Sequence, residues 1–245
     1  MRHFIQAVLT TALVCGGGTA AAQDDWRAEV AARLPDSGAL NLRLINAGEE
    51  DGFMRLGWRR NGDRIELFDR TMMVSSDVYE SMTAAMTSDD FAPLDTLILW
   101  HQDTAILTVE TLAEPGRATG TRTVLRPMQG VEHAPLDVEL PDGVMPRAAT
   151  FVFAPFLDLE PGESLTYDWY AVLSNSVATV TVTAFDGGPV DTPAGRYEET
   201  LRLEVRGATP EDQIPLNDIY VTGGEVVRID VVGQGMTFLR RAEPE

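Results

Sequence analysis

The sequence contains no lysine, a single cysteine and only three histidines. Without lysine the protein cannot form a Schiff base. Cys15 lies in an N-terminal segment that we expect to be removed, so the mature chain has no disulfide and no thiol nucleophile. Removal of that segment leaves His101 and His133. Two histidines are too few for a three-histidine zinc site, and the sequence predicts no cofactor and no metal.

Positive charge is scarce as well. The chain carries 19 basic residues, all of them arginine, against 38 acidic ones, which gives a net charge of −19. Loss of Arg2 with the N-terminal segment leaves 18 − 38 = −20. A surface of this sign repels phosphate backbones and anionic headgroups, so we expect no nucleic-acid partner. The net negative charge indicates a well-solvated surface and does not point to a particular activity.

The sequence also lacks the short motifs that mark common active sites. It has no G-x-S-x-G elbow, no glycine-rich nucleotide loop and no calcium loop of the D-x-[DN]-x-[DN]-G type. Both remaining histidines are expected in turns or on the surface, so we predict no catalytic residue. Carboxylates are abundant, but no pair stands out. Two carboxylates that face each other in space, as glycoside hydrolysis requires, stay open as an alternative.

Residues 1–22 have the three parts of a secretory signal peptide. Arg2 and His3 form the charged start, residues 4–14 an apolar run, and residues 20–22 (AAA) a small-residue cleavage site. The apolar run is too short to span a bilayer, and no later run is long and apolar enough to do so. We therefore predict an exported, periplasmic protein with one large β domain over residues 23–245.

Alternation of apolar and polar residues predicts strands along most of the mature chain. A first meander covers residues 38–126, with leucine at every second position of residues 40–44 and a two-residue turn at Asn61-Gly62. Residues 69–87 fit a helix or a strand, and we favour a strand. Residues 127–141 carry prolines and polar residues and are expected to be a connection. Short strands at this spacing predict a mostly β, antiparallel sheet that is curled or half closed into a barrel.

Two segments predict helices. Residues 24–34 begin with aspartates at the cap position and place Trp26, Val30 and Leu34 on one face, which is typical of a short amphipathic helix. Residues 147–157 (RAATFVFAPFL) are apolar all round. They predict either a short buried helix or an apolar loop that plugs the barrel, broken near a proline.

The clearest alternation lies in residues 190–205 (VDTPAGRYEETLRLEV), where a turn leads into a strand with one buried face. Glu199 falls on the apolar face of this strand, between Tyr197 and Leu201. A buried carboxylate must be paired or protonated. Arg228, on a nearby C-terminal strand, is the partner that we predict, and a strand-end residue near solvent is the other interpretation.

Several short motifs in residues 142–241 resemble a family of Gram-negative periplasmic proteins known as a domain of unknown function. The motifs are LEPGE at residues 159–163, VDTPAGRY at residues 190–197 and VVRI at residues 226–229. The resemblance implies an open or half-closed β-barrel with a helix at its mouth, similar in outline to periplasmic lipoprotein carriers. The chain departs from the family at Ile219-Tyr220, where tryptophan is common. The function of the family is not established, so no catalytic residue is carried over.

Aromatic side chains indicate where a ligand would lie, because they line apolar cavities, although ordinary core packing also accounts for them. The predicted ligand-binding residues are Trp58, Phe151, Phe153, Phe156, Trp169, Glu199 and Arg228. Trp100 is a further aromatic of this kind. Our leading hypothesis is a periplasmic protein that binds an apolar small molecule, a lipid or a segment of an envelope protein. The alternatives are an interaction module without a ligand and a carboxylate-dependent polysaccharide hydrolase.

Overall fold

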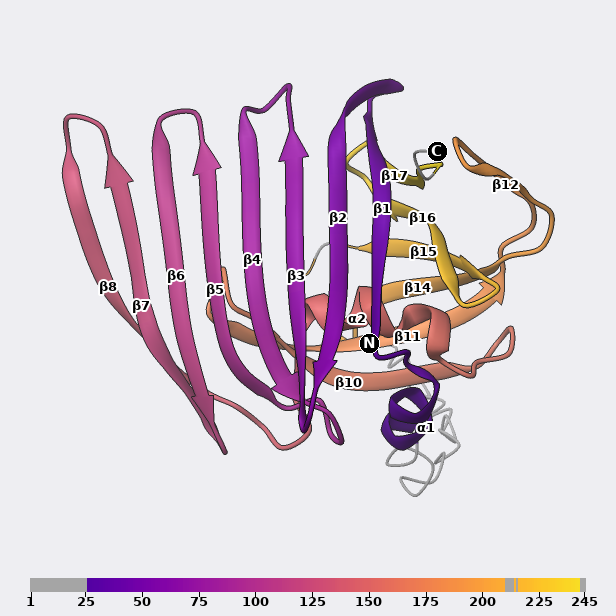
Figure 1. Cartoon of the computed structure of the whole chain (residues 1–245), viewed down its shortest axis with the longest axis horizontal. Helices are drawn as coiled ribbons and strands as arrows, with labels where there is room; N and C mark the ends of the chain where they lie inside the picture. Colours follow the sequence, from indigo (N-terminus) through magenta and orange to yellow (C-terminus); the bar gives the residue numbers. More distant parts are fainter. Residues whose placement is uncertain (1–25, 210–213, 215, 243–245) are drawn as a thin grey trace, which may run out of the picture.

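The computed structural model describes residues 26–209, 214 and 216–242, so the predicted signal peptide lies outside the described residues. The first half of the chain forms one helix and then eight long strands in a meander (Figure 1). These elements are α1 Trp26–Arg33, β1 Ser37–Asn46, β2 Glu49–Asn61, β3 Arg64–Met73, β4 Val78–Thr87, β5 Pro93–Gln102, β6 Ala105–Glu114, β7 Arg117–Arg126 and β8 Gly130–Glu139. We call β1 to β8 the N-terminal limb. Residues 69–87 form the end of β3 and the whole of β4, and are therefore strands as favoured.

The second half of the chain forms a short helix and the remaining strands. These elements are β9 Met145–Pro146, α2 Arg147–Phe153, the 3-10 helix η2 Ala154–Phe156, β10 Ser164–Ala171, β11 Ser176–Asp186, β12 Val190–Thr192, β13 Gly195–Tyr197, β14 Leu201–Gly207, β15 Asn217–Thr222, β16 Glu225–Val231 and β17 Met236–Arg240. We call β9 to β11 together with β14 to β17 the C-terminal limb.

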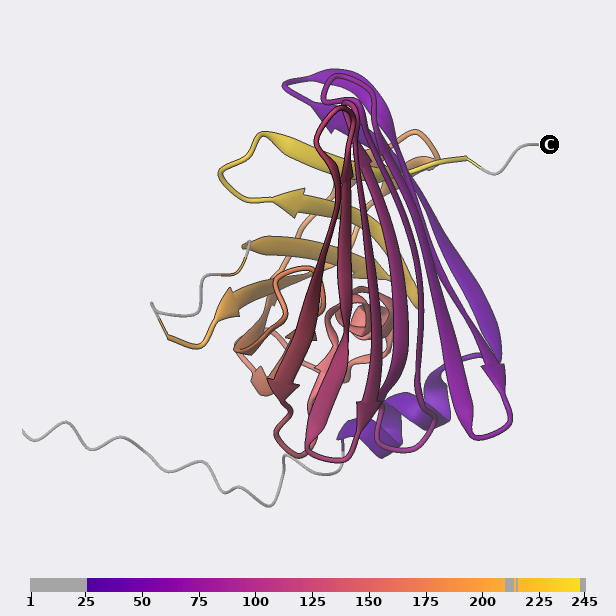
Figure 2. The same cartoon turned by 90° about the vertical axis from the view of Figure 1, so that its left-hand side faces the viewer.

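Fifteen of the described strands belong to one sheet, in the order β8-β7-β6-β5-β4-β3-β2-β1-β17-β16-β15-β14-β11-β10-β9. Neighbouring strands are antiparallel, except that β9 runs parallel to β10. The sheet is curled and not closed, because β8 and β9 are its two ends. Figure 2 shows the two limbs facing each other with α2 between them. The structure confirms the mostly β, half-closed architecture with a short N-terminal helix and one apolar helix.

The inner face of the sheet is the face that packs against α2. The leucines at positions 40, 42 and 44 lie in one buried cluster with Ala149, Val152 and Phe153 of the helix. The ring of Phe153 lies against that of Phe91, with 4.3 Å between their centroids. Strand alternation buries one face of the sheet, and the apolar side chains of α2 cover it. The segment at residues 147–157 is thus a short buried helix, as one of the two interpretations predicted.

A second, smaller apolar cluster joins the outer strands of the N-terminal limb to the C-terminal limb. On one side it contains Met82, Ile98, Val109 and Ala118, and on the other Leu140, Val144, Tyr170 and Val172. The two rows of side chains bury each other, so this end of the inner face is covered.

The connection expected over residues 127–141 is wrong, because most of it is strand β8. β8 pairs with β7 from Arg126↔Gly130 to Arg117↔Glu139. It is the edge strand of the sheet and most of its residues are exposed, so its sequence carries little of the alternation that marks a strand. Pro135 is tolerated there because one side of an edge strand has no ladder to complete.

The long strand expected in residues 190–205 is interrupted. Residues 190–197 form the separate hairpin β12–β13, and β14 begins only at Leu201. Thr200 is buried in the break and donates a hydrogen bond of 2.8 Å to the carbonyl of Gly188, which holds the hairpin outside the main sheet. Glu199 lies in the same break and is exposed, so its placement on a buried strand face is wrong.

The turn between β2 and β3 falls one residue later than the sequence predicts. Asn61 still pairs with Arg64, so the two-residue loop is Gly62-Asp63. Gly62 has a φ of +63°, which glycine adopts without strain. One central position with positive φ satisfies this hairpin, whereas the predicted turn required two.

We predict that Phe153→Ala lowers the free energy of unfolding by about 3–5 kcal/mol, the usual cost of removing a fully buried phenyl ring. Phe151→Ala, in the same helix but partly exposed, is the matched control and should cost clearly less. Urea denaturation followed by circular dichroism measures both. Equal losses for the two variants would contradict a core built on the inward side of α2.

Candidate functional site

The five predicted ligand-binding aromatics lie in or against the core cluster around α2. Trp58, Phe153 and Trp169 are buried, and Phe151 and Phe156 pack against the same cluster while partly exposed. Trp58 meets Phe156 edge to face, with centroids 6.1 Å apart, and its indole N–H donates to a backbone carbonyl at 2.9 Å. Protein atoms already cover the buried members, so a ligand would reach them only after α2 moved. Their role in ligand binding stays a prediction.

The two predicted charged residues are not brought together. Glu199 is exposed in the break before β14. Arg228 on β16 donates instead to Asp230, with 2.9 Å between Nε and Oδ1, and its guanidinium lies 5.2 Å from the centroid of Tyr220. The Arg228 side chain thus already has an acidic partner on its own strand. The sequence suggested the pairing with Glu199 because both residues were assigned to one continuous wall, which the β12–β13 hairpin interrupts.

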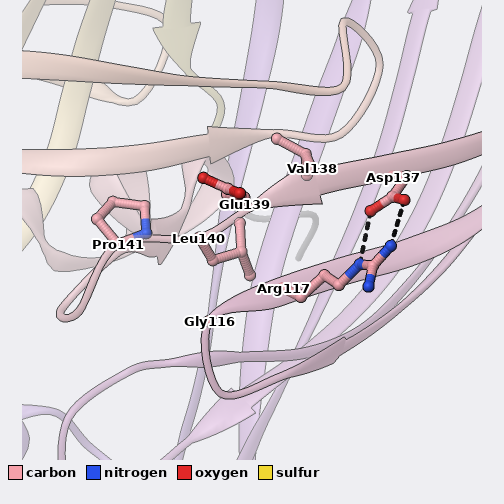
Figure 3. A pocket seen from close by; sticks show the side chains of 7 residues that line it. All are labelled: Gly116, Arg117, Asp137, Val138, Glu139, Leu140 and Pro141. Atoms are coloured by element: carbon pink, nitrogen blue, oxygen red, sulfur yellow. Dashed lines mark hydrogen bonds and ion pairs between the residues drawn. The ribbon is translucent and has the colours of Figure 1, made fainter.

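A polar hollow of about 820 Å³ lies at the end of the β7–β8 hairpin (Figure 3). It is lined by residues 116–117 and 137–141, and none of the predicted ligand-binding residues takes part. Its one basic side chain, Arg117, is held in a two-point ion pair by Asp137, with Nε–Oδ1 at 2.7 Å. Figure 3 shows this pair at the rim. Asp137 occupies the one basic side chain, and the remaining charged residue of the lining is the acidic Glu139, so the hollow offers little for recognition of an anion.

Two carboxylates stand where the alternation of β3 and β4 calls for apolar side chains. On β3, Asp69 follows the buried Leu67 by two residues; on β4, Glu80 lies two residues after the buried Val78. Residues two apart share a face of a strand, so both carboxylates point to the inner face. Asp69 pairs across the sheet with Met82 and Glu80 with Thr71, which makes the two acidic residues diagonal neighbours.

The N-terminus of α2 brings a cation to the same place. Arg147 is the first residue of the helix, and the charges of both Asp69 and Glu80 act on it. Its guanidinium lies 5.4 Å from the centroid of the fully buried Trp169. Within the part of the chain that the structure describes, the Trp169 indole N–H has no hydrogen-bond partner.

These groups are poorly satisfied by the protein itself. Asp69 accepts a hydrogen bond of 2.9 Å from the Thr71 hydroxyl. By contrast, neither Glu80 nor Arg147 forms a hydrogen bond, or an ion pair within 4 Å, with any residue among those described. Water reaches part of both side chains, so neither is a fully buried group without a partner. Two adjacent charged groups on the inner face that the described residues leave unpaired mark this cluster as the candidate site.

Burial changes the acidity of the cluster. Protein atoms surround most of each side chain, although water still reaches part of all three. Desolvation raises the pKa of Asp69 to about 6, against the lowering by its hydrogen bond from Thr71. Desolvation and then the charge of Asp69 raise the pKa of Glu80 to about 7. Burial lowers the pKa of Arg147, which still remains a cation at neutral pH.

A row of one acidic and three apolar side chains runs from this cluster toward the edge of the sheet. Adjacent strands pair Glu80 with Trp100, Trp100 with Leu107, and Leu107 with Val124. The four side chains therefore lie side by side on the inner face. We call them the inner row. All four are partly exposed, unlike the neighbouring Met82 and Ile98, which the C-terminal limb covers. The arrangement offers a cation, two protonatable acids and an apolar surface beside them.

Sequence reasoning named Trp100 as an aromatic but missed Asp69, Glu80 and Arg147. The alternation pattern could have revealed the two acids, because each occupies a position on the buried face of its strand where an apolar residue is expected. No such pattern marked Arg147, because a polar residue at the start of an apolar helical segment is ordinary. Only the folding of α2 against β3 and β4 brings it to the carboxylates.

No family model matches the chain, and no curated protein matches it. Among solved structures, a DUF1089 family protein from Pseudomonas aeruginosa is similar over 75% of this chain and 90% of that chain, with 13% identity and a TM-score of 0.38. That protein belongs to a domain-of-unknown-function family. The likeness is too slight to assign this chain to a family or an activity. The periplasmic location and the similarity to lipoprotein carriers stay predictions.

None of the helices in the part of the chain that the structure describes combines the length and the apolar character that crossing a membrane requires. No three or more of the histidine, cysteine, aspartate and glutamate side chains among the described residues come together in a way that would hold a metal ion.

We predict that Glu80→Gln stabilises the protein at about pH 8 but has little effect at about pH 5. The folded state keeps the proton on Glu80 up to about pH 7, whereas the unfolded chain releases it near the ordinary value of 4.5. The folded state therefore loses stability as the pH rises between these values, and the loss is complete above the higher one. The full shift corresponds to about 3 kcal/mol, and we expect about 2 kcal/mol because water reaches part of the side chain.

Urea denaturation of the wild type and the variant at both pH values measures this difference. Glu110→Gln, which removes an exposed carboxylate from the outer face of β6, is the control and should change little at either pH. A Glu80→Gln effect of the same size at both pH values would contradict burial of an ionisable Glu80.

Proposed function

We propose that the protein is an exported, periplasmic binding protein that holds an apolar or amphiphilic molecule on the inner face of its N-terminal limb. The observation that carries the proposal is the inner row, where Trp100, Leu107 and Val124 stay partly exposed beside Glu80 and Arg147. Ligand sites in proteins combine mostly apolar walls with a few polar groups that fix orientation. The inner row and the adjacent charges have this composition.

The dimensions of the row support a small ligand. It crosses four strands, β4 to β7, and strands lie about 4.8 Å apart, so it is about 14 Å long. One end of the row meets the charged cluster, and the other approaches the edge strand β8, where the sheet is open. A ligand lying along the row would place a polar end near Arg147 and an apolar body over Leu107 and Val124.

We predict that the neutral fluorescent probe phenylnaphthylamine binds the protein and that Leu107→Glu weakens this binding at least about tenfold, because a carboxylate resists burial under an apolar ring. Leu112→Glu is the matched control. Leu112 is on the same strand but faces outward and is 68% exposed, so this variant should bind as the wild type does. Fluorescence titration measures all three proteins.

Leu107→Ala serves as a second variant should the glutamate prevent folding, and a weaker loss is expected there. Native mass spectrometry of the purified protein, before and after lipid extraction, detects a ligand carried from the cell. Failure of the wild type to bind the probe, together with an unchanged mass after extraction, would contradict the proposed function. That result would favour an interaction module that acts without a ligand.

A second candidate function rests on Asp69 and Glu80 themselves. Diagonal neighbours on adjacent strands have Cβ atoms about 7–8 Å apart, which is compatible with the carboxyl separations that glycosidases use. The raised pKa of Glu80, about 7, would suit a general acid, with Asp69 ionised first at about 6. The pair supports a carboxylate-dependent polysaccharide hydrolase as the alternative.

If the protein is such a hydrolase, it releases reducing sugars from envelope polysaccharide, and Glu80→Gln lowers the rate at least about a hundredfold. Phenylnaphthylamine binding by the same variant should persist, because Trp100, Leu107 and Val124 are unchanged. A reducing-sugar assay decides the matter. No release by the wild type would remove this candidate and leave the binding function untouched.

A further inference from the structure

Arg147 is a cation that the protein surrounds without pairing. Its guanidinium makes no hydrogen bond, and no ion pair within 4 Å, to any of the described residues, although it rests above the ring of Trp169 at 5.4 Å. Partial burial of a charge without a protein partner is unfavourable, and the water that reaches the side chain offsets only part of this cost. A guanidinium offers five N–H donors in a fixed plane, which suit two-point binding of carboxylate, sulfonate or phosphate. A position of this kind is explained by an anion that binds there.

The nearby acids do not take that role. Asp69 and Glu80 act on Arg147 through their charges, but neither reaches it within ion-pair distance. Asp69 is instead held by Thr71. When neutral, the two acids could each donate a proton to a group bound beside the arginine. The apolar inner row begins at the same point, since Glu80 is its first member.

We infer that the molecule bound along the inner row carries an anionic group and that Arg147 binds this group. The inference rests on the proposed binding function and names the chemical class of its ligand: an amphiphile with one acidic end. The Trp169 ring forms a cation–π contact with the guanidinium. The three apolar members of the inner row contact the body of the ligand.

The binding is coupled to protons. The charged groups that face the site are Asp69 from β3, Glu80 from β4 and Arg147 from α2. Farther along the same face are Arg122 and Arg126 of β7 and Glu132 of β8, and Arg126 forms an ion pair of 3.0 Å with Glu132. Below about pH 6 the two nearest acids are neutral, and the positive charge of Arg147 is unopposed. Above about pH 7 both are ionised, and the local charge of one cation and two anions is negative. An anionic ligand is therefore held more tightly at the lower pH.

Two fluorescent probes of nearly the same shape test the inference. Anilinonaphthalene sulfonate carries a negative charge throughout this pH range, and phenylnaphthylamine is its neutral counterpart. At about pH 5 we expect Arg147→Met to weaken sulfonate binding about tenfold and to leave binding of the neutral probe within about twofold. For the wild type, raising the pH to about 8 should weaken sulfonate binding about tenfold and leave the neutral probe unchanged. Glu80→Gln should reduce that pH dependence.

Arg59→Met is the matched control, because it removes an exposed arginine from the outer face of β2, away from the inner row. It should leave sulfonate binding within about twofold of the wild type, whereas an equal loss in both arginine variants would reveal general charge attraction and overturn the inference. If Arg147→Met does not fold, Arg147→Lys is used to test the inference. It keeps the cation, so it should retain the pH dependence with reduced affinity.

The two proposals fail differently. If the neutral probe binds but sulfonate binding ignores both Arg147 and pH, the acidic-ligand inference is wrong and the binding function stands. If neither probe binds the wild type, the proposed function itself is wrong.

Discussion

One sheet must bury one apolar face, and the rest of the structure depends on this constraint. In the described part of the chain, fifteen strands form a single sheet with only two short α-helices beside it, α1 and α2. A flat sheet of that width would leave its apolar face in water, and the twist of antiparallel strands allows it to curl instead. The curl brings the two limbs face to face, and α2 fills the space between them (Figure 2). The helix is therefore apolar from Ala148 to Phe153 apart from Thr150, because most of its surface packs against the sheet.

Against such a core, the inward charges are costly exceptions. Asp69 and Glu80 occupy positions that burial would give to valine or leucine, and the raised pKa values of about 6 and about 7 reflect the cost. Arg147 adds a third unfavourable group next to them. Folding alone would be served better by apolar residues at all three positions. Groups that oppose stability and gather in one place are typical of sites selected for binding or catalysis.

The sequence predicts the fold well wherever one face of a strand is buried, because period-two alternation then records the environment directly. Strands β1 to β6, β10 and β11 follow this rule. It fails at β8, which is exposed on both faces, and at Glu199, where a local side-chain bond interrupts an apparently continuous strand. The candidate site is harder to predict. The pairing of β3 with β4 makes Asp69 and Glu80 neighbours, but Arg147 lies far downstream in the sequence. Only the packing of α2 onto the N-terminal limb brings Arg147 to the two acids. Patterns within single strands carry no information about such packing.

The position of the site follows from the difference in strand length between the two limbs. The strands of the N-terminal limb have 10 to 13 residues, while β14 to β17 have only 5 to 7. The shorter limb cannot cover the whole inner face of the longer one. Where it does reach, Met82, Ile98 and Val109 are buried. Beyond its reach, Trp100 and Leu107 keep part of their surface open. The apolar phase of the long strands continues across this boundary because each strand alternates along its whole length. The alternation that forms the buried core therefore also produces a partly exposed apolar surface. The unpaired charge of Arg147 lies between the core and this surface.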